Sequence, residues 1–166
     1  MFDSCVLGVD PGLATTGLAT VRGRPGLVEI DWAETVRTPN GLAEPSRLRR
    51  LHDAVAAAIR DRGVDAVAVE RVMWGRNVGS AMSVARATGV VLLAAEQAGL
   101  AVEEYAPLEV KMAVAGVGNA PKETLRRALV RTHGLRNVPP DPDAADAVAV
   151  AFCHVQQSRL RKAVRA

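Results

Sequence analysis

Four acidic residues lie directly at the ends of apolar runs, where a folding chain would otherwise avoid charge. Asp10 and Glu70 each end a short apolar run, and Asp143 and Asp146 open another. Carboxylates held together beside a hydrophobic core repel one another and lose hydration, so either their pKa values rise or a divalent cation gathers them. We expect the cation, which requires a fold that brings these chain-distant elements to one place.

All-oxygen ligand sets of this kind suit Mg²⁺ or Mn²⁺. A pair of such ions about 3.5–4 Å apart drives in-line phosphoryl chemistry in nucleases. Asp143 and Asp146 are three residues apart, so a helix would place both on one face. An alternative is an N-terminal capping pair with Asp143 as the cap, although capping gives no reason for Asp10 and Glu70. The pattern favours a metal-dependent nuclease.

Size and charge are consistent with one nucleic-acid-binding domain. The chain has 166 residues, enough for a single well-buried domain. Lys and Arg outnumber Asp and Glu by 21 to 18, and several acids are proposed ligands, so the remaining surface favours a polyanionic partner. We expect one domain over residues 1–158 and a basic tail at 159–166. Cys5 and Cys153 lack metal-ligand spacing and suit reduced, packed thiols in a cytoplasmic protein.

The apolar stretches predict no membrane association. Asp3 interrupts the short apolar start, which argues against a signal peptide. The longest apolar or small stretch is bounded by Arg86 and Glu96 and is far shorter than the roughly 20 residues that a spanning helix needs.

Hydrophobic periodicity and turn residues predict a mixed α/β sheet flanked by helices. The expected strands are 5–10, 17–21, 27–35, 66–70 and 101–105, the first three forming an antiparallel meander. The expected helices are one capped by Ser46 and ended by Gly63, followed by 78–98, 107–115, 121–132 and 144–160. The helix at 78–98 is apolar on almost every side, so it is covered either by the chain's own helices or by a second copy across a two-fold axis.

Five segments of the chain resemble one known family. They are 7–12 with Thr16 and Gly17, 69–72, 106–111, 116–122 and 143–147. These segments stand in the order and spacing of RuvC-type Holliday junction resolvases, and the likeness runs nearly end to end.

The resemblance implies a ribonuclease H-like fold, with a mixed five-stranded sheet, working as a homodimer. It implies a magnesium-dependent endonuclease that resolves four-way DNA junctions by paired symmetric nicks, leaving 5′-phosphates, in recombination and repair. Two Mg²⁺ ions per site are expected, with Mn²⁺ as a substitute, and a branch-migration helicase complex as a partner. The residues implied to be catalytic are Asp10, Glu70, Asp143, Asp146, Lys111 and Lys122, the four acids also holding the metal.

The resemblance also implies DNA contacts in the loop after Glu70 and at the two lysines. The expected DNA-binding residues are Arg71, Met73, Trp74, Arg76, Asn77, Lys111 and Lys122. Relatives place an aromatic side chain against unstacked bases in this loop, a role that falls here to Met73 or Trp74. Trp74 could instead plug the core.

The chain departs from the family pattern just before Asp143, where Asp141 adds an acid and three prolines, at 139, 140 and 142, stiffen the approach.

Three other functions are open to the same residues. A related-fold ATPase or sugar kinase would need a second phosphate loop. A noncatalytic nucleic-acid-binding module would use its acids structurally, and another ribonuclease H-like nuclease would share the metal cluster but not the substrate.

Overall fold

The computed structural model describes residues 4–73 and 78–165, and for 159–165 only the course of the backbone. Trp74, Arg76 and Asn77 therefore lie outside the described residues.

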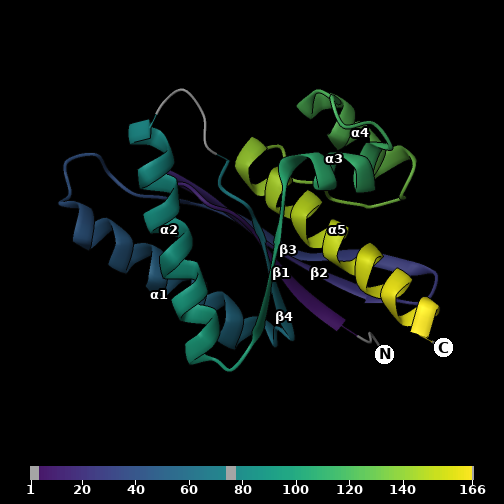
Figure 1. Ribbon diagram of the computed structural model, residues 1–166, viewed down its shortest axis with the longest axis horizontal. Helices are drawn as coiled ribbons and strands as arrows, with labels where there is room; N and C mark the ends of the chain where they lie inside the picture. The colour runs from purple at the N-terminus through teal and green to yellow at the C-terminus, as the bar shows by residue number, and fades with distance from the viewer. Residues whose placement is uncertain (1–3, 74–77, 166) are drawn as a thin grey trace.

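A five-stranded sheet forms the centre of the molecule (Figure 1). Its strands are β1 Ser4–Asp10, β2 Thr15–Arg24, β3 Leu27–Arg37, β4 Ala66–Glu70 and β5 Ala101–Tyr105. They stand in the order β3-β2-β1-β4-β5, in which the pairs β3–β2 and β2–β1 are antiparallel and the pairs β1–β4 and β4–β5 are parallel. The predicted meander and mixed sheet are confirmed. The strand β2 exceeds its predicted range at both ends and β3 at its C-terminal end, because their antiparallel pairing runs from Thr15 opposite Arg37 to Arg24 opposite Leu27 at the turn.

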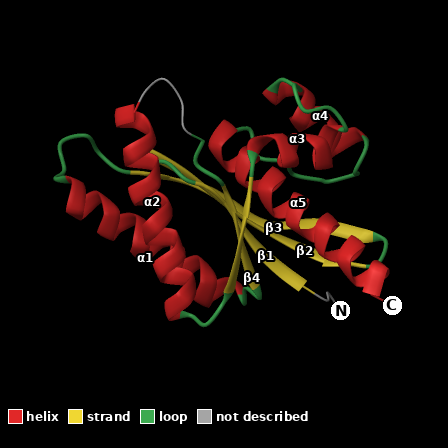
Figure 2. Cartoon of the chain, in the orientation of Figure 1, coloured by secondary structure: helices red, strands yellow, loops and turns green. Residues whose placement is uncertain are grey.

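Helices cover both faces of this sheet (Figure 2). Their bounds are α1 Glu44–Arg62, α2 Val78–Gln97, α3 Pro107–Ala115, α4 Lys122–Arg131 and α5 Pro142–Arg165. One buried core joins the sheet to α1 and α2, and a second joins the opposite face to α3, α4 and α5. The helix α5 packs chiefly on β1 and β2.

The predicted start of α1 is wrong, whereas its end is confirmed. The N-cap is Ala43, without a side-chain hydrogen bond, and Pro45 stands in the first turn. Proline is favoured there because its missing N–H would have had no intrahelical partner. Ser46 therefore lies inside the helix. Gly63 is the C-cap, with a left-handed φ of 61° that glycine adopts without strain.

Two glycines allow α5 to lie directly on the sheet. A Cβ at Gly8 of β1 would clash with the Ala147 carbonyl oxygen, and one at Gly17 of β2 would clash with the Asp143 carbonyl oxygen. The first turn of α5 is thus held against β2 by backbone contact. Gly17 pairs with Asp10 across the β1–β2 ladder, so this contact also sets α5 beside Asp10.

One side of α2 is buried against α1 and the sheet, and the other side is exposed. Ala87, Val91 and Ala95 are fully buried. Val78, Met82 and Leu93 are 56%, 47% and 52% exposed, so within the described chain the protein's own helices cover α2 on one side only.

By length and composition α2 also meets the test for a membrane-spanning helix, a test applied to the described residues, which core helices pass as well. That helix contains Arg86 and Glu96, the two charged residues that bound the short apolar stretch of the sequence.

Candidate active site

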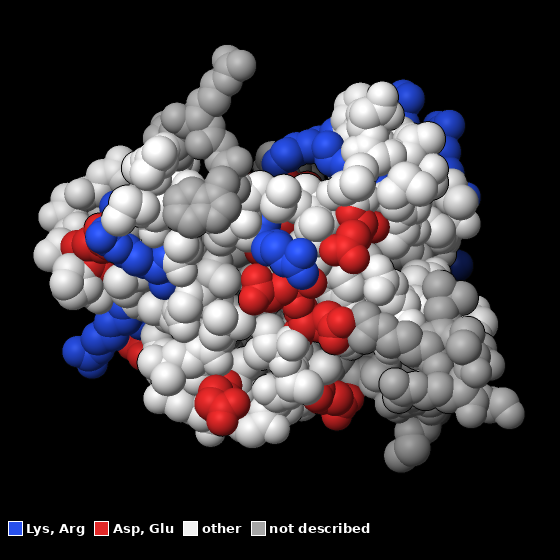
Figure 3. Space-filling view, viewed as in Figure 1, with Lys and Arg blue, Asp and Glu red and all other residues white. Residues whose placement is uncertain are grey.

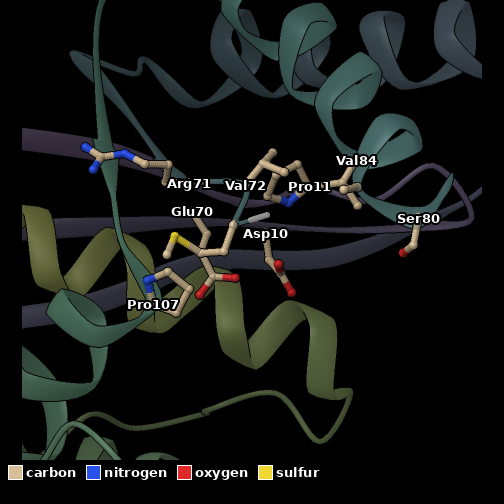
Figure 4. A pocket seen from close by; sticks show the side chains of 10 residues that line it. Asp10, Pro11, Glu70, Arg71, Val72, Ser80, Val84 and Pro107 are labelled. Carbon is tan, nitrogen blue, oxygen red and sulfur yellow. The ribbon is translucent and has the colours of Figure 1, made fainter. Parts of the chain in front are cut away.

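Asp10 and Glu70 leave the same end of two neighbouring strands. Asp10 is the last residue of β1 and Glu70 the last of β4, and these strands are parallel with Val9 opposite Val69. The two side chains share a hydrogen bond, and Figure 4 shows both carboxyl groups pointing to the same side of the strand ends. Because both acids stand on rigid strands, their carboxylates are held in place by the sheet.

The helix α5 brings the other two acids to this strand end. Asp143 and Asp146 lie in its first turns, and the charges of both carboxylates raise the pKa of Asp10. Four acids from three distant parts of the chain therefore lie close enough for their charges to interact, as the sequence predicted.

Asp141, not Asp143, caps α5. Its Oδ1 accepts hydrogen bonds from the backbone N–H groups of Asp143 at 3.1 Å and Ala144 at 3.4 Å. The hydroxyl of Thr35 and the guanidinium of Arg37 also donate to the Asp141 carboxylate, which lowers its pKa to about 2. The alternative that Asp143 serves as the cap is wrong.

Burial and mutual repulsion dominate the electrostatics of the strand-end acids. Burial, followed by the charges of Glu70 and Asp146, raises the pKa of Asp10 from 3.8 to about 7, against the opposing charge of Lys122. Burial and Asp146 also raise the pKa of Glu70, while Lys122, Lys111 and the hydrogen bond from Asp10 oppose that rise. A cluster of half-buried carboxyl groups with raised pKa values is typical of a functional site.

Both predicted lysines lie at this cluster. Lys122 begins α4 and its Nζ forms an ion pair with Asp146, which raises the pKa of Lys122. A cation at a helix N-terminus opposes the helix dipole, so the acid cluster rather than the helix accounts for its place. Lys111 lies in the middle of α3 and lowers the pKa of Glu70 by its charge. Figure 3 shows acidic and basic side chains side by side near the middle of this face.

The donor set fits a hard divalent cation. It consists of carboxylate oxygens, the ligand type that Mg²⁺ and Mn²⁺ prefer. Among the described residues, however, no three or more His, Cys, Asp or Glu side chains are already arranged to hold a metal ion. Asp10 and Glu70 instead hydrogen bond to each other, and Asp146 pairs with Lys122. The ion pair with Lys122 thus compensates part of the negative charge that a cation would offset.

A cavity of about 510 Å³ opens beside the two strand-end acids. Residues of α2 form one wall, and Pro107 of α3 lies at another side (Figure 4). The wall residues Ser80, Ala81 and Val84 were not predicted, since they look like ordinary positions of an apolar helix.

The predicted DNA-contact loop is described only in part. Arg71 and Met73 line the cavity, and Met73 is 60% exposed. The Arg71 guanidinium points away from the acids and donates to the Glu104 carbonyl oxygen at 3.2 Å. Trp74, Arg76 and Asn77, to which base or phosphate contacts were assigned, fall outside the described residues.

Comparisons with known proteins identify relatives over nearly the whole chain. The family model for the crossover junction endodeoxyribonuclease RuvC matches residues 6–154. The RuvC of Syntrophomonas wolfei is 42% identical over 93% of this chain and 90% of its own length. The RuvC of Chloroflexus aurantiacus is 43% identical over 89% of this chain and 90% of its own.

A solved structure shows the same architecture. Thermus thermophilus RuvC in complex with a Holliday junction substrate superposes with a TM-score of 0.88 at 34% identity, covering 95% of this chain and 96% of the other. The five-stranded mixed sheet flanked by helices is thus the ribonuclease H-like fold that the resemblance implied. The chain belongs to the RuvC family of crossover junction endodeoxyribonucleases.

Proposed function

We propose that this protein is a divalent-metal-dependent endonuclease that resolves Holliday junctions by paired symmetric nicks in recombination and repair. One observation carries the proposal: Asp10, Glu70, Asp143 and Asp146 interact at one strand end, in a chain whose relative was solved with a Holliday junction substrate.

The four acids would hold two Mg²⁺ ions, with Mn²⁺ as a substitute. Such ions, when bound, activate a water and stabilise the leaving 3′ oxygen, so that the cut leaves a 5′-phosphate. Asp10 and Glu70, whose pKa values are raised, must lose any proton that they carry before they bind a cation, because a carboxylate ligates in its ionised form. Lys122 and Lys111 lower the pKa of Glu70 and so assist that loss. Either lysine could also stabilise the added negative charge at the phosphate or orient the water.

DNA binding would centre on the rim of the cavity. Arg71 and Met73 are exposed there, and Lys111 and Lys122 carry positive charge toward the acids. We assign phosphate contacts to Arg71, Arg76 and Asn77 and base stacking to Met73 or Trp74. The basic residues at 159–166 would add salt-sensitive, nonspecific attraction.

Two opposed strands require two active centres, so we propose a homodimer formed through the exposed side of α2. Its apolar residues Val78, Met82 and Leu93 suit a two-fold contact.

We also propose cooperation with a branch-migration helicase complex and a cytoplasmic location, for which the free thiols Cys5 and Cys153 are suited.

One assay separates the candidate functions. The protein is incubated with a synthetic four-way junction, a linear duplex and an RNA–DNA hybrid, each with and without Mg²⁺. A junction resolvase cuts only the junction, at symmetric positions and only with Mg²⁺. Cutting of the hybrid or the duplex would point to another ribonuclease H-like nuclease. Junction binding without cutting under every condition would point to a noncatalytic module.

A further inference from the structure

Three strands present one row of residues to the beginning of α5. Asp10 of β1 is paired with Gly17 of β2, and Gly17 is paired with Thr35 of β3. The row therefore runs across the sheet from the half-buried Asp10 to the edge strand β3.

The first turns of α5 lie along this row. At the edge strand, the Thr35 hydroxyl donates to Asp141 Oδ1 at 2.5 Å. In the middle, the Asp143 carbonyl oxygen packs on Gly17 so closely that no side chain would fit. At the far end, the Asp143 and Asp146 carboxylates act on Asp10. The first two contacts thus fix the helix at β3 and at β2, and this places its two acids near Asp10 of β1.

The Asp141 side chain connects the N-terminus of α5 to the edge strand β3. Besides Thr35, it accepts from Arg37 at 2.6 Å and from the backbone N–H of Asp143 and of Ala144. It holds both the strand β3 and the N-terminus of the helix that carries two of the four acids. We call Asp141, Thr35 and Arg37 the Asp141 clamp.

We propose that Asp141 is a positioning residue, which through the Asp141 clamp sets where Asp143 and Asp146 stand relative to Asp10 and Glu70. The inference rests on the proposed metal-dependent nuclease function. Groups that orient metal ligands without touching the metal commonly contribute to affinity, because they hold the ligand in the geometry that the ion needs. Asp141 is the added acid at which the sequence departs from the family pattern, and none of the catalytic roles above uses it.

The test compares three variants. Asp141→Ala removes every hydrogen bond that the Asp141 carboxylate accepts from Thr35, Arg37 and the backbone of α5. Asp141→Asn keeps an oxygen for Thr35 and the two backbone donors, and it loses both the charge and the acceptor oxygen that face Arg37. Thr35→Val removes a single donor at nearly constant volume. The control is Asp53→Ala, which removes an exposed acid of α1 whose carboxylate lies 3.8 Å from Arg49 and 3.4 Å from His52.

Two readouts are measured on the full-length protein. Mn²⁺ binding without DNA is followed by electron paramagnetic resonance, and kcat and KM for a four-way junction are measured over a range of Mg²⁺ concentrations. We expect Asp141→Ala to weaken Mn²⁺ affinity by about 10–100-fold. The variant should lower kcat at limiting Mg²⁺, leave the junction KM unchanged and recover activity with excess Mg²⁺. Asp141→Asn should restore most of the affinity, Thr35→Val should be intermediate and Asp53→Ala should match the unmodified protein.

Unchanged Mn²⁺ affinity in a folded Asp141→Ala variant would overturn the inference, as would an equal loss in Asp53→Ala. Folding is checked by circular dichroism. If Asp141→Ala does not fold, Thr35→Val decides, and unchanged affinity in that variant is the contrary result. If the unmodified protein cuts no junction, the proposed function fails, while the Mn²⁺ affinities still decide the role of the Asp141 clamp.

Discussion

Ionisation of the Asp10 carboxyl group destabilises the folded protein. Its folded pKa of about 7 lies above the ordinary 3.8, so its contribution to stability is full below the ordinary value and is lost as pH rises through 7. At about 1.4 kcal/mol per pKa unit, the upper limit is roughly 4 kcal/mol. We predict that the metal-free protein has a larger free energy of unfolding at pH 5 than at pH 8, measured by urea denaturation with a chelator. Glu70, whose pKa is also raised, acts in the same direction.

The Asp10→Asn variant separates stability from activity. Removing the buried charge should make the metal-free protein more stable than the unmodified one at pH 8, with no such gain at pH 5. The same variant should bind a four-way junction normally and cut it at least about 100-fold more slowly, because a metal ligand is lost. Gel-shift and nicking assays on one preparation measure both properties. Cutting at the normal rate would show that Asp10 holds no catalytic ion.

Lys122 tunes the acids as well as pairing with Asp146. Its charge lowers the pKa of both Asp10 and Glu70. Lys122→Ala should therefore raise both values further and move the rising limb of the pH–rate profile to higher pH, in addition to any loss of rate. Arg127→Ala is the matched control, since Arg127 lies on the same helix and pairs with Glu123 on the surface. An unshifted profile for Lys122→Ala would contradict this role.

Residue-level prediction succeeded where a side chain stood against the local trend. Acids at the ends of core strands have no local explanation, so a tertiary role was inferable for them, whereas Lys111 and Lys122 were named only through the family resemblance. The capping residue was misassigned although the sequence held the signal, because a proline at the first helical position makes the preceding Asp141 the cap. Ser80, Ala81 and Val84 were beyond prediction, since only the packing of α2 places them at the cavity.

At the scale of elements, the contact between α5 and the sheet depends on two glycines. Gly8→Ala and Gly17→Ala each place a methyl group against the helix backbone, and overpacking of this kind costs about 1–3 kcal/mol. We predict that both variants are destabilised in thermal unfolding. Gly17→Ala should also lose nicking activity in the folded protein, because the obstructed atom belongs to Asp143. Gly41→Ala, with open space around its Cβ, is the control.

Most elements could be predicted because turn residues and apolar periodicity agree along this chain. The predicted start of α1 was wrong because a proline in the first turn allows the helix to begin before the apparent serine cap. The pairing of β4 with β1 was not derivable from periodicity, since a parallel neighbour is chosen by tertiary packing. That pairing brings Glu70 to Asp10, so the geometry of the site could be learned only from the structure and not from the sequence.

For the whole molecule, the exposed side of α2 predicts self-association. Met82→Glu places a charge in the proposed two-fold contact and should convert a dimer to a monomer in analytical ultracentrifugation. Such a monomer should also lose paired cutting of a junction. Val130→Glu on α4, another exposed apolar position, should leave the dimer intact. A monomeric unmodified protein, or a dimer indifferent to Met82→Glu, would place the contact elsewhere.

The central claim is that four carboxylates from distant segments form one divalent-metal centre. The most direct measurement is an anomalous difference map from crystals soaked in Mn²⁺ near pH 8, where Asp10 is ionised. We predict anomalous peaks among Asp10, Glu70, Asp143 and Asp146, and their loss in Asp10→Asn crystals. Peaks at other positions only, or a map unaffected by the substitution, would contradict the account.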